Sequence, residues 1–167
     1  LHQCCDVDDG RVSNGRNVTP KAGCALLLHD VKRILLIKTS SLGDVVHNLP
    51  VVNDICQRFP DAVIDWAVEQ AYAPLVALHP GVHQVLPVAV RRWRRAWWRR
   101  SSWREIDNFR QSVMEQPPYD AVIDTQGLLK SAVLGCMAAG VRHGFDARSV
   151  REPLASLCYQ QRHAVTR

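Results

Sequence analysis

Short apolar runs rich in β-branched residues recur along this chain, and a segment with helical spacing follows almost every one of them. The run at 33–38, Arg-Ile-Leu-Leu-Ile-Lys, is continuous and bounded by charged residues, which is typical of a parallel strand buried on both faces. Further strands are expected at 62–68, 85–88, 119–124 and 141–145. Strands that alternate with helices at this spacing predict right-handed βαβ units. The predicted fold class is therefore α/β: a Rossmann-like open parallel sheet with helices on both faces.

The expected helices differ in how clearly the sequence marks them. Residues 45–56 carry apolar side chains at helical spacing, but Pro50 interrupts them. Either a short first turn kinks at this proline, or the main helix begins there. Segments 70–78 and 127–139 are also expected to be helical, and 103–116 reads as an amphipathic helix. Its inward-facing residues are expected to be Ile106, Phe109, Val113 and Met114.

The chain divides into two parts. Residues 1–30 show no sustained period and lack the basic-then-apolar order of a signal peptide, so we expect a disordered leader or upstream translation that ends where order begins, at Val31. Residues 31–167 are expected to form one domain, close to the usual size of roughly 100–150 residues. No apolar run approaches the ~18–20 residues that span a bilayer. The six cysteines lack the spacing of a zinc site, so no metal is expected.

The stretch 91–104, RRWRRAWWRRSSWR, holds seven arginines, four of the five tryptophans and no acidic residue. Without it the net charge of +5 would become −2, so the basic character is a local patch that suits an anion. Arginine forks bind carboxylates and phosphates, and tryptophans favour boundaries between apolar and polar media. An anionic sugar, an anionic membrane and a single-stranded nucleic acid all remain open as partners.

Three polar loops are expected at the carboxyl ends of strands, where ligands bind in open α/β sheets: 39–44, 88–102 and 124–130. The first, TSSLGD, has one glycine and no lysine, which weighs against a dinucleotide site and a P-loop. Its Asp44 can act as a general base or can simply cap the next helix. Lys130 falls in the first turn of a helix, where the dipole disfavours a cation unless an anionic ligand lies nearby.

Several separated segments together resemble one family. VKRILLIKTSSLGDVVHNLP, PVAVRRWRRAW and YDAVIDTQGLLKSA, followed by HGFD and REPLASLCY, are similar to the N-terminal half of the lipopolysaccharide heptosyltransferase I family over residues 31–165. The resemblance implies the acceptor-binding domain of a GT-B glycosyltransferase, truncated before the donor domain. The reaction it implies is an inverting, metal-independent transfer of heptose from ADP-heptose to Kdo of Kdo-lipid A, in assembly of the lipopolysaccharide inner core.

The resemblance also implies roles for particular residues. Asp44 would be the general base. The acceptor would be bound by Ser40, Ser41, Gly43, Arg91, Arg92, Arg94, Arg95, Gln126, Lys130 and Arg151. Membrane contact is expected from Trp93, Trp97 and Trp98.

The implied location is the cytoplasmic side of the bacterial inner membrane, as a peripheral protein. No cofactor is expected, because ADP-heptose is a donor substrate that the missing domain would bind. This chain alone is expected to be inactive. Nucleic acid is not an expected partner in this reading, and the alternative is a single-stranded nucleic-acid-binding module built on 91–104.

Overall fold

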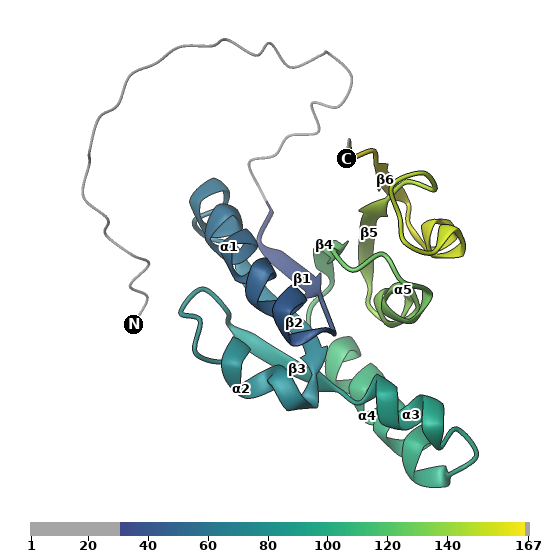
Figure 1. The fold of residues 1–167 in the computed structure, drawn as a ribbon. Helices are drawn as coiled ribbons and strands as arrows, with labels where there is room; N and C mark the ends of the chain where they lie inside the picture. Colours follow the sequence, from purple (N-terminus) through teal and green to yellow (C-terminus); the bar gives the residue numbers. More distant parts are fainter. Residues whose placement is uncertain (1–30, 166–167) are drawn as a thin grey trace, which may run out of the picture.

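The computed structural model describes residues 31–165, which form a six-stranded sheet with every strand pair parallel (Figure 1). The strands are β1 (Arg33–Ile37), β2 (Val63–Glu69), β3 (Gln84–Val88), β4 (Tyr119–Asp124), β5 (Gly140–Phe145) and β6 (Gln161–His163). Their order in the sheet is β3-β2-β1-β4-β5-β6, the order of a doubly wound Rossmann sheet. The five predicted strands are confirmed, and β6, a short strand of exposed residues, was not predicted.

Helices cover both faces of this sheet. They are α1 (Leu42–Arg58), α2 (Ala73–Val76), α3 (Val90–Arg95), α4 (Arg100–Met114) and α5 (Leu129–Cys136), with 3-10 turns η1 (Gln70–Tyr72) and η2 (Pro153–Cys158). Alternate residues of β1 divide between two cores. Ile34 and Leu36 pack with α1 and α2, whereas Leu35 and Ile37 pack with α4 and α5. The predicted α/β fold with helices on both faces is therefore confirmed.

Helix α1 runs through Pro50 without a break. The expectation that the main helix begins at this proline is wrong. The proline lacks the N–H that would bond to the carbonyl of Val46, one turn earlier. Both residues are exposed, so water can satisfy that carbonyl. The inward face of the helix, which includes Val45 and Val52, is buried against the sheet and stabilises the helix despite the proline.

The arginine–tryptophan stretch is not the loop that the sequence suggested, because it forms α3 and the start of α4. Val90 and Trp93, three residues apart on α3, are both buried and anchor this short helix to the core. Helix α4 buries Phe109 and Val113 as predicted, and Ile106 packs partly buried beside them. Met114 was expected to face inward, but its side chain is 59% exposed at the end of the helix.

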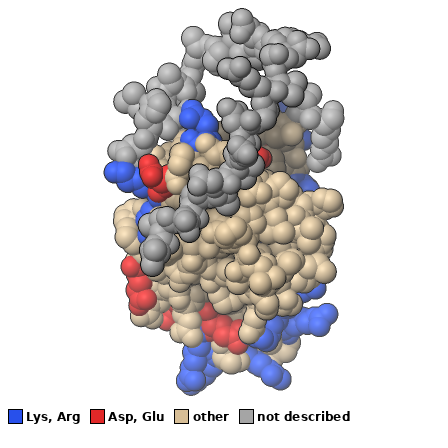
Figure 2. All heavy atoms as spheres, turned by 90° about the vertical axis from the view of Figure 1, so that its left-hand side faces the viewer, with Lys and Arg blue, Asp and Glu red and all other residues tan. Residues whose placement is uncertain are grey.

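Charge is distributed unevenly over this fold. Figure 2 shows Lys and Arg side chains at the lower end of one face, the end that α3 and α4 form in Figure 1, with Asp and Glu beside them and further Lys and Arg near the upper end, while the middle of that face is largely uncharged. The predicted leader, residues 1–30, lies outside the described residues. Within residues 31–165, no helix is both long enough and apolar enough to cross a membrane.

Candidate acceptor site at the carboxyl edge of the sheet

The sheet places its ligand crevice between β1 and β4. In a doubly wound sheet the loops on either side of the point where strand order reverses leave in opposite directions, and a crevice opens outside the carboxyl ends of those strands. Here the reversal lies between β1 and β4, so the two loops that flank it are residues 38–41 and 125–128. These belong to two of the three loops that the sequence predicted to converge.

Gln126 ties these two loops together. Its Oε1 accepts hydrogen bonds from the backbone N–H of Thr39 at 2.8 Å and from the Thr39 hydroxyl at 2.7 Å. Its Nε2 donates to Oγ of Ser40 at 3.2 Å. Gln126 and Ser40 are both buried where the two loops meet, and their predicted role in acceptor binding stays a prediction. The side chain of Gln126 is occupied in positioning the first loop rather than facing open space.

The turn after β4 is organised by the buried carboxylate of Asp124. It accepts hydrogen bonds from the hydroxyl groups of Tyr159 at 2.6 Å and Ser131 at 2.8 Å. It also accepts them from the backbone N–H groups of Gln126 and Gly127, at 2.8 and 3.2 Å. Burial is the largest influence on this carboxyl and raises its pKa, although the four donors oppose that shift. Gly127 has a φ of +65°, which favours glycine at this turn.

Lys130 points from the first turn of α5 back to the first loop, where its Nζ donates to Oγ of Ser40 at 3.0 Å. Loss of hydration lowers the pKa of Lys130, and the positive charges of Arg91 and Arg94 lower it further, while Glu69 opposes them. The cation therefore lies among other cations at a helix start, which is unfavourable without an anionic partner. That Lys130 binds an anionic ligand stays a prediction.

Asp44 caps α1 and remains a possible base. As the third residue of a capping box, it accepts the Ser41 N–H at 2.9 Å and the Ser41 hydroxyl at 3.2 Å, both at Oδ2. The backbone N–H of Ser41 is the main reason that the pKa of Asp44 is lowered, and Lys38 and Arg151 lower it further. Among residues 31–165 no recorded hydrogen bond reaches Oδ1. One oxygen of an ionised carboxylate is therefore open to a substrate hydroxyl.

The positive charges near Asp44 come from both sides of the crevice. Lys38 donates to the carbonyl of Thr125 at 3.1 Å, and its pKa is lowered by burial while Asp44 opposes that shift. Arg151 lies close enough to act electrostatically on both Lys38 and Asp44. Gly43 and Ser41 are exposed at the start of α1, and a Cβ built on Gly43 would meet open space.

The four arginines of α3 do not share one orientation. Arg91 and Arg94 act electrostatically on Lys130 and so face the crevice. Arg92 instead forms an ion pair with Glu105 of α4, 2.8 Å between Nη2 and Oε2, and lies within 3.4 Å of Gln70. Arg95 is exposed and lies beside Arg91 and Arg92. Arg94 therefore lines the same cavity as Lys130, Arg91 lies near enough to act on Lys130 electrostatically, and Arg92 is turned toward α4.

The tryptophans also divide. Trp97 and Trp98 are each 65% exposed on the segment between α3 and α4, which leaves them available for contact with a membrane surface. Trp93 is only 8% exposed, and its Nε1–H donates to Glu105 at 2.7 Å. The expectation of membrane contact is therefore wrong for Trp93, because its indole is packed into the core between α3 and α4.

Four residues of this crevice were not predicted: Lys38, Thr39, Glu69 and Glu152. Lys38 and Thr39 follow β1 and Glu69 ends β2, so a place at the carboxyl end of a strand was the signal for these three, whereas Glu152 follows no strand directly and had no such signal. Glu152 accepts the backbone N–H of Leu129 and so caps α5, with 2.6 Å between the two atoms. Across residues 31–165 no group of three or more His, Cys, Asp or Glu side chains is placed to hold a metal ion.

The fold is that of a Rossmann-like domain with a crevice lined by several cations, and the comparisons with known proteins place it more narrowly. The model for glycosyltransferase family 9 (heptosyltransferase) matches residues 106–167. Lipopolysaccharide heptosyltransferase 1 of Salmonella typhimurium is 47% identical over 136 residues, which cover 81% of this chain and 43% of that protein. The chain is thus similar in sequence to one part of a family 9 glycosyltransferase.

Solved structures agree. The structure described as E. coli heptosyltransferase WaaC with ADP superposes with a TM-score of 0.76 at 46% identity, covering 81% of this chain and 42% of that one. E. coli ADP-heptose lps heptosyltransferase II, at 21% identity, shares the fold with a TM-score of 0.61 over 80% of this chain and 35% of its own. The resemblance inferred from sequence is confirmed, and the chain spans less than half the length of these relatives. Nothing among them supports a nucleic-acid-binding module.

Proposed function

We propose that this chain is the acceptor-binding part of a lipopolysaccharide heptosyltransferase, which transfers heptose from ADP-heptose to Kdo of Kdo-lipid A. The observation that carries the proposal is the group of cations at the reversal point of the sheet: Arg91 and Arg94 act electrostatically on Lys130. Lys130 in turn donates to Ser40, the neighbour of the residue whose N–H binds Asp44. Within residues 31–165 these three cations have no recorded ion pair. A sugar acid with carboxylate and phosphate groups would supply the missing negative charge.

The proposed reaction uses Asp44 as general base. As the acceptor hydroxyl oxygen bonds to the anomeric carbon of heptose, the bond from that carbon to ADP breaks on the opposite face, and the hydroxyl proton passes to Asp44 Oδ1. The lowered pKa of Asp44 keeps the carboxylate ionised at neutral pH, so it is ready to accept that proton. Arg91, Arg94 and Lys130 would hold the acceptor's anionic groups and so orient the hydroxyl.

The same proposal places the chain at the inner face of the bacterial inner membrane. Trp97 and Trp98 are exposed beside the arginines of the α3–α4 segment, and tryptophan with arginine is a combination that suits the interface of an anionic bilayer. Ser41, Gly43 and Arg151 are the other residues that would contact the acceptor, because they line the open side of the crevice near Asp44.

Heptose transfer by a chimera tests this function. Residues 31–167 of this chain would replace the matching part of the E. coli K12 relative, which is 46% identical. We expect transfer from ADP-heptose to Kdo-lipid A, and a loss of roughly 10²–10⁴-fold in kcat for Asp44→Asn. Asp54→Asn, an exposed residue on the same helix, is the matched control and should leave kcat unchanged. Full turnover by the Asp44→Asn chimera would contradict the assignment.

A further inference from the structure

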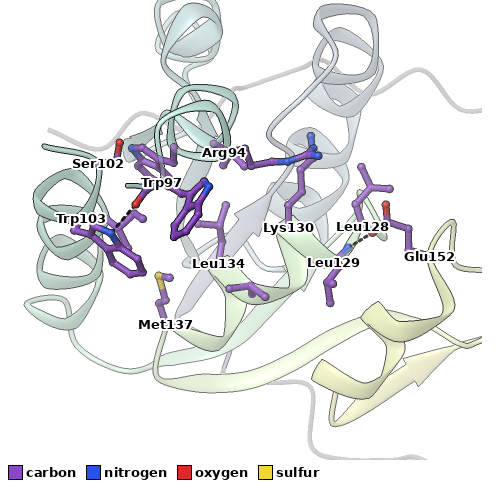
Figure 3. Close-up of a pocket in the computed structure, with 14 residues that line it drawn as sticks. Arg94, Trp97, Ser102, Trp103, Leu128, Leu129, Lys130, Leu134, Met137 and Glu152 are labelled. Carbon is purple, nitrogen blue, oxygen red and sulfur yellow. Dashed lines mark hydrogen bonds between the residues drawn. The ribbon is translucent and has the colours of Figure 1, made fainter. Parts of the chain in front are cut away.

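A large apolar cavity lies beside the anion site and has no part in the proposed transfer chemistry. Its volume is about 630 Å³, within the range of roughly 300–1,000 Å³ typical of ligand pockets. Figure 3 shows it between α3 and α4 on one side and α5 on the other. Trp97, Trp103 and Ile106 form the first wall, and Val133, Leu134 and Met137 form the second.

Several large apolar side chains in the walls of this cavity are exposed. Trp103 is 60% exposed, Trp97 65% and Val133 45%. A hydrogen bond of 2.8 Å from Trp103 Nε1–H to the Trp97 carbonyl joins the helix to the preceding turn and helps hold Trp103 at the cavity. Contiguous apolar surface of this kind marks a binding site for another apolar group.

Cations stand at one end of the apolar walls. Figure 3 shows the side chains of Arg94 and Lys130 extending from opposite sides toward the same point at the edge of the cavity. Lys130 is held there by its hydrogen bond to Ser40, which also belongs to the proposed acceptor site. A hydrocarbon slot with positive charge at its mouth is complementary to an amphiphile with an anionic head.

We propose that this cavity binds one acyl chain of the anionic glycolipid acceptor while Arg94 and Lys130 hold a phosphate or carboxylate of its head group. The proposal rests on the proposed function, because it assigns the occupant to the same acceptor. It adds that recognition extends beyond the sugar and into the lipid. Exposed Trp98 does not line this cavity, so it remains available for contact with the membrane surface.

Alkyl phosphates provide the probe. The 167-residue chain would be titrated calorimetrically with octyl, decyl and dodecyl phosphate below their micelle concentrations, and with methyl phosphate and dodecyl maltoside. If the alkyl chain occupies the cavity, each added methylene should improve affinity about fourfold, so two methylenes should improve it about fifteenfold. Methyl phosphate and the uncharged maltoside should bind at least tenfold more weakly than dodecyl phosphate.

Two valines with the same exposure supply a matched pair of variants. Val133 lines the cavity, whereas Val46 lies on α1 outside it, and each is 45% exposed on a helix. Val133→Glu should weaken dodecyl phosphate binding at least tenfold, and Val46→Glu should change it less than twofold. Trp103→Ala, at another exposed wall residue, should also weaken binding. Circular dichroism would confirm that all three variants are folded.

The outcomes separate the two proposals. Binding of a delipidated Kdo disaccharide should be unchanged in Val133→Glu, because the sugar does not enter the cavity. If the disaccharide fails to bind while dodecyl phosphate binds as expected, the cavity stands and the proposed acceptor is wrong. Affinity that is independent of chain length, or equal weakening by Val133→Glu and Val46→Glu, would overturn the acyl-chain site. If folded protein does not bind dodecyl phosphate at all, the acyl-chain site is also overturned, and a protein segment becomes the better candidate occupant of the cavity.

Discussion

Each end of the strands in this sheet carries a buried aspartate, and the two are surrounded in different ways. Asp65, at the amino end, is fully buried and is satisfied by Arg33 at 2.8 Å, Tyr119 at 2.9 Å and His83 at 3.0 Å. The guanidinium carbon of Arg33 also lies 5.6 Å from the centre of the Tyr119 ring. Asp124, at the carboxyl end, is satisfied by hydroxyls and backbone N–H groups alone.

Because of this difference, the cation beside Asp65 has an ion-pair partner, whereas three cations at the carboxyl end have none recorded among residues 31–165. At the amino end the carboxylate is paired with Arg33 within the fold, so that end is suited to stability. At the carboxyl end Asp124 is satisfied by neutral donors, and the cations Arg91, Arg94 and Lys130 face the crevice without recorded ion pairs among the described residues. A surplus of positive charge in a crevice costs stability and creates a site for anions. From this comparison we infer that the amino end of the sheet serves stability, and we propose that the carboxyl end serves ligand binding.

The largest effect on stability is expected at the amino end. Asp65→Ala would leave the half-buried Arg33 and the buried Tyr119 hydroxyl without their shared acceptor, and should lower the free energy of unfolding by about 3–5 kcal/mol. Burial is the largest cause of the raised pKa of Tyr119 and persists without Asp65, so the hydroxyl would stay neutral and lack its acceptor. Urea unfolding measures the loss. Asp61→Ala, at an exposed loop position, is the control and should stay within about 0.5 kcal/mol.

If Asp65→Ala costs less than about 1 kcal/mol, the network at the amino end is not the stabilising element that we infer. The variant should also retain acceptor affinity per folded molecule, because Asp65 lies at the opposite end of the strands from the crevice.

In contrast to Asp65→Ala, Lys130→Met should weaken acceptor binding without lowering stability. Removing a partly dehydrated cation that lies near two arginines should leave the free energy of unfolding unchanged or slightly higher, although one hydrogen bond to Ser40 is lost. Binding of a Kdo disaccharide should weaken about tenfold, since a charged hydrogen bond is worth roughly 1.5–3 kcal/mol. Calorimetry and urea unfolding on the same samples measure both effects. A variant that loses stability and keeps full affinity would reverse the roles we assign.

The smallest effect concerns the pH dependence of Asp44. Its pKa is lowered on folding, chiefly by the Ser41 N–H, so its contribution to stability is present above its unfolded pKa of about 4. That contribution is lost as the pH falls through the lower folded value. The stability difference between wild type and Asp44→Asn should therefore be constant from neutral pH to about 5 and shrink below about 4. Urea unfolding across this range would show it, and a pH-independent difference would contradict the capping role.

Particular residues show how far the sequence could predict the fold. The apolar runs fixed five strands and, through their alternation with helices, the α/β architecture. The start of α1 could not be predicted because the cost of Pro50 inside a helix was visible in the sequence, whereas the stabilising burial of Val45 and Val52 is visible only in the tertiary structure. The three exposed residues of β6 carry no apolar pattern, so pairing with β5 alone makes them a strand.

The sequence predicted which loops lie together at the carboxyl edge, but it did not predict how the side chains there are oriented. The convergence of the loops that contain Ser40 and Gln126 followed from the rule that ligands bind at carboxyl ends of parallel strands. The orientation of the α3 arginines did not follow, because reading 91–104 as a loop hid the helical face that Val90 and Trp93 define. Once α3 is helical, Arg92 must face α4 and meet Glu105, whereas Arg91 and Arg94 are left to the crevice.

The most direct test of this division is acceptor binding by arginine variants of the whole chain, measured by calorimetric titration with a delipidated Kdo disaccharide. We predict saturable binding by wild type, at least tenfold weaker binding by the double variant Arg91→Ala/Arg94→Ala, and a change of less than about threefold for Arg92→Ala. Equal loss in the double variant and in Arg92→Ala, or no binding by folded wild type, would contradict the claim that the cations at the carboxyl edge form the acceptor site.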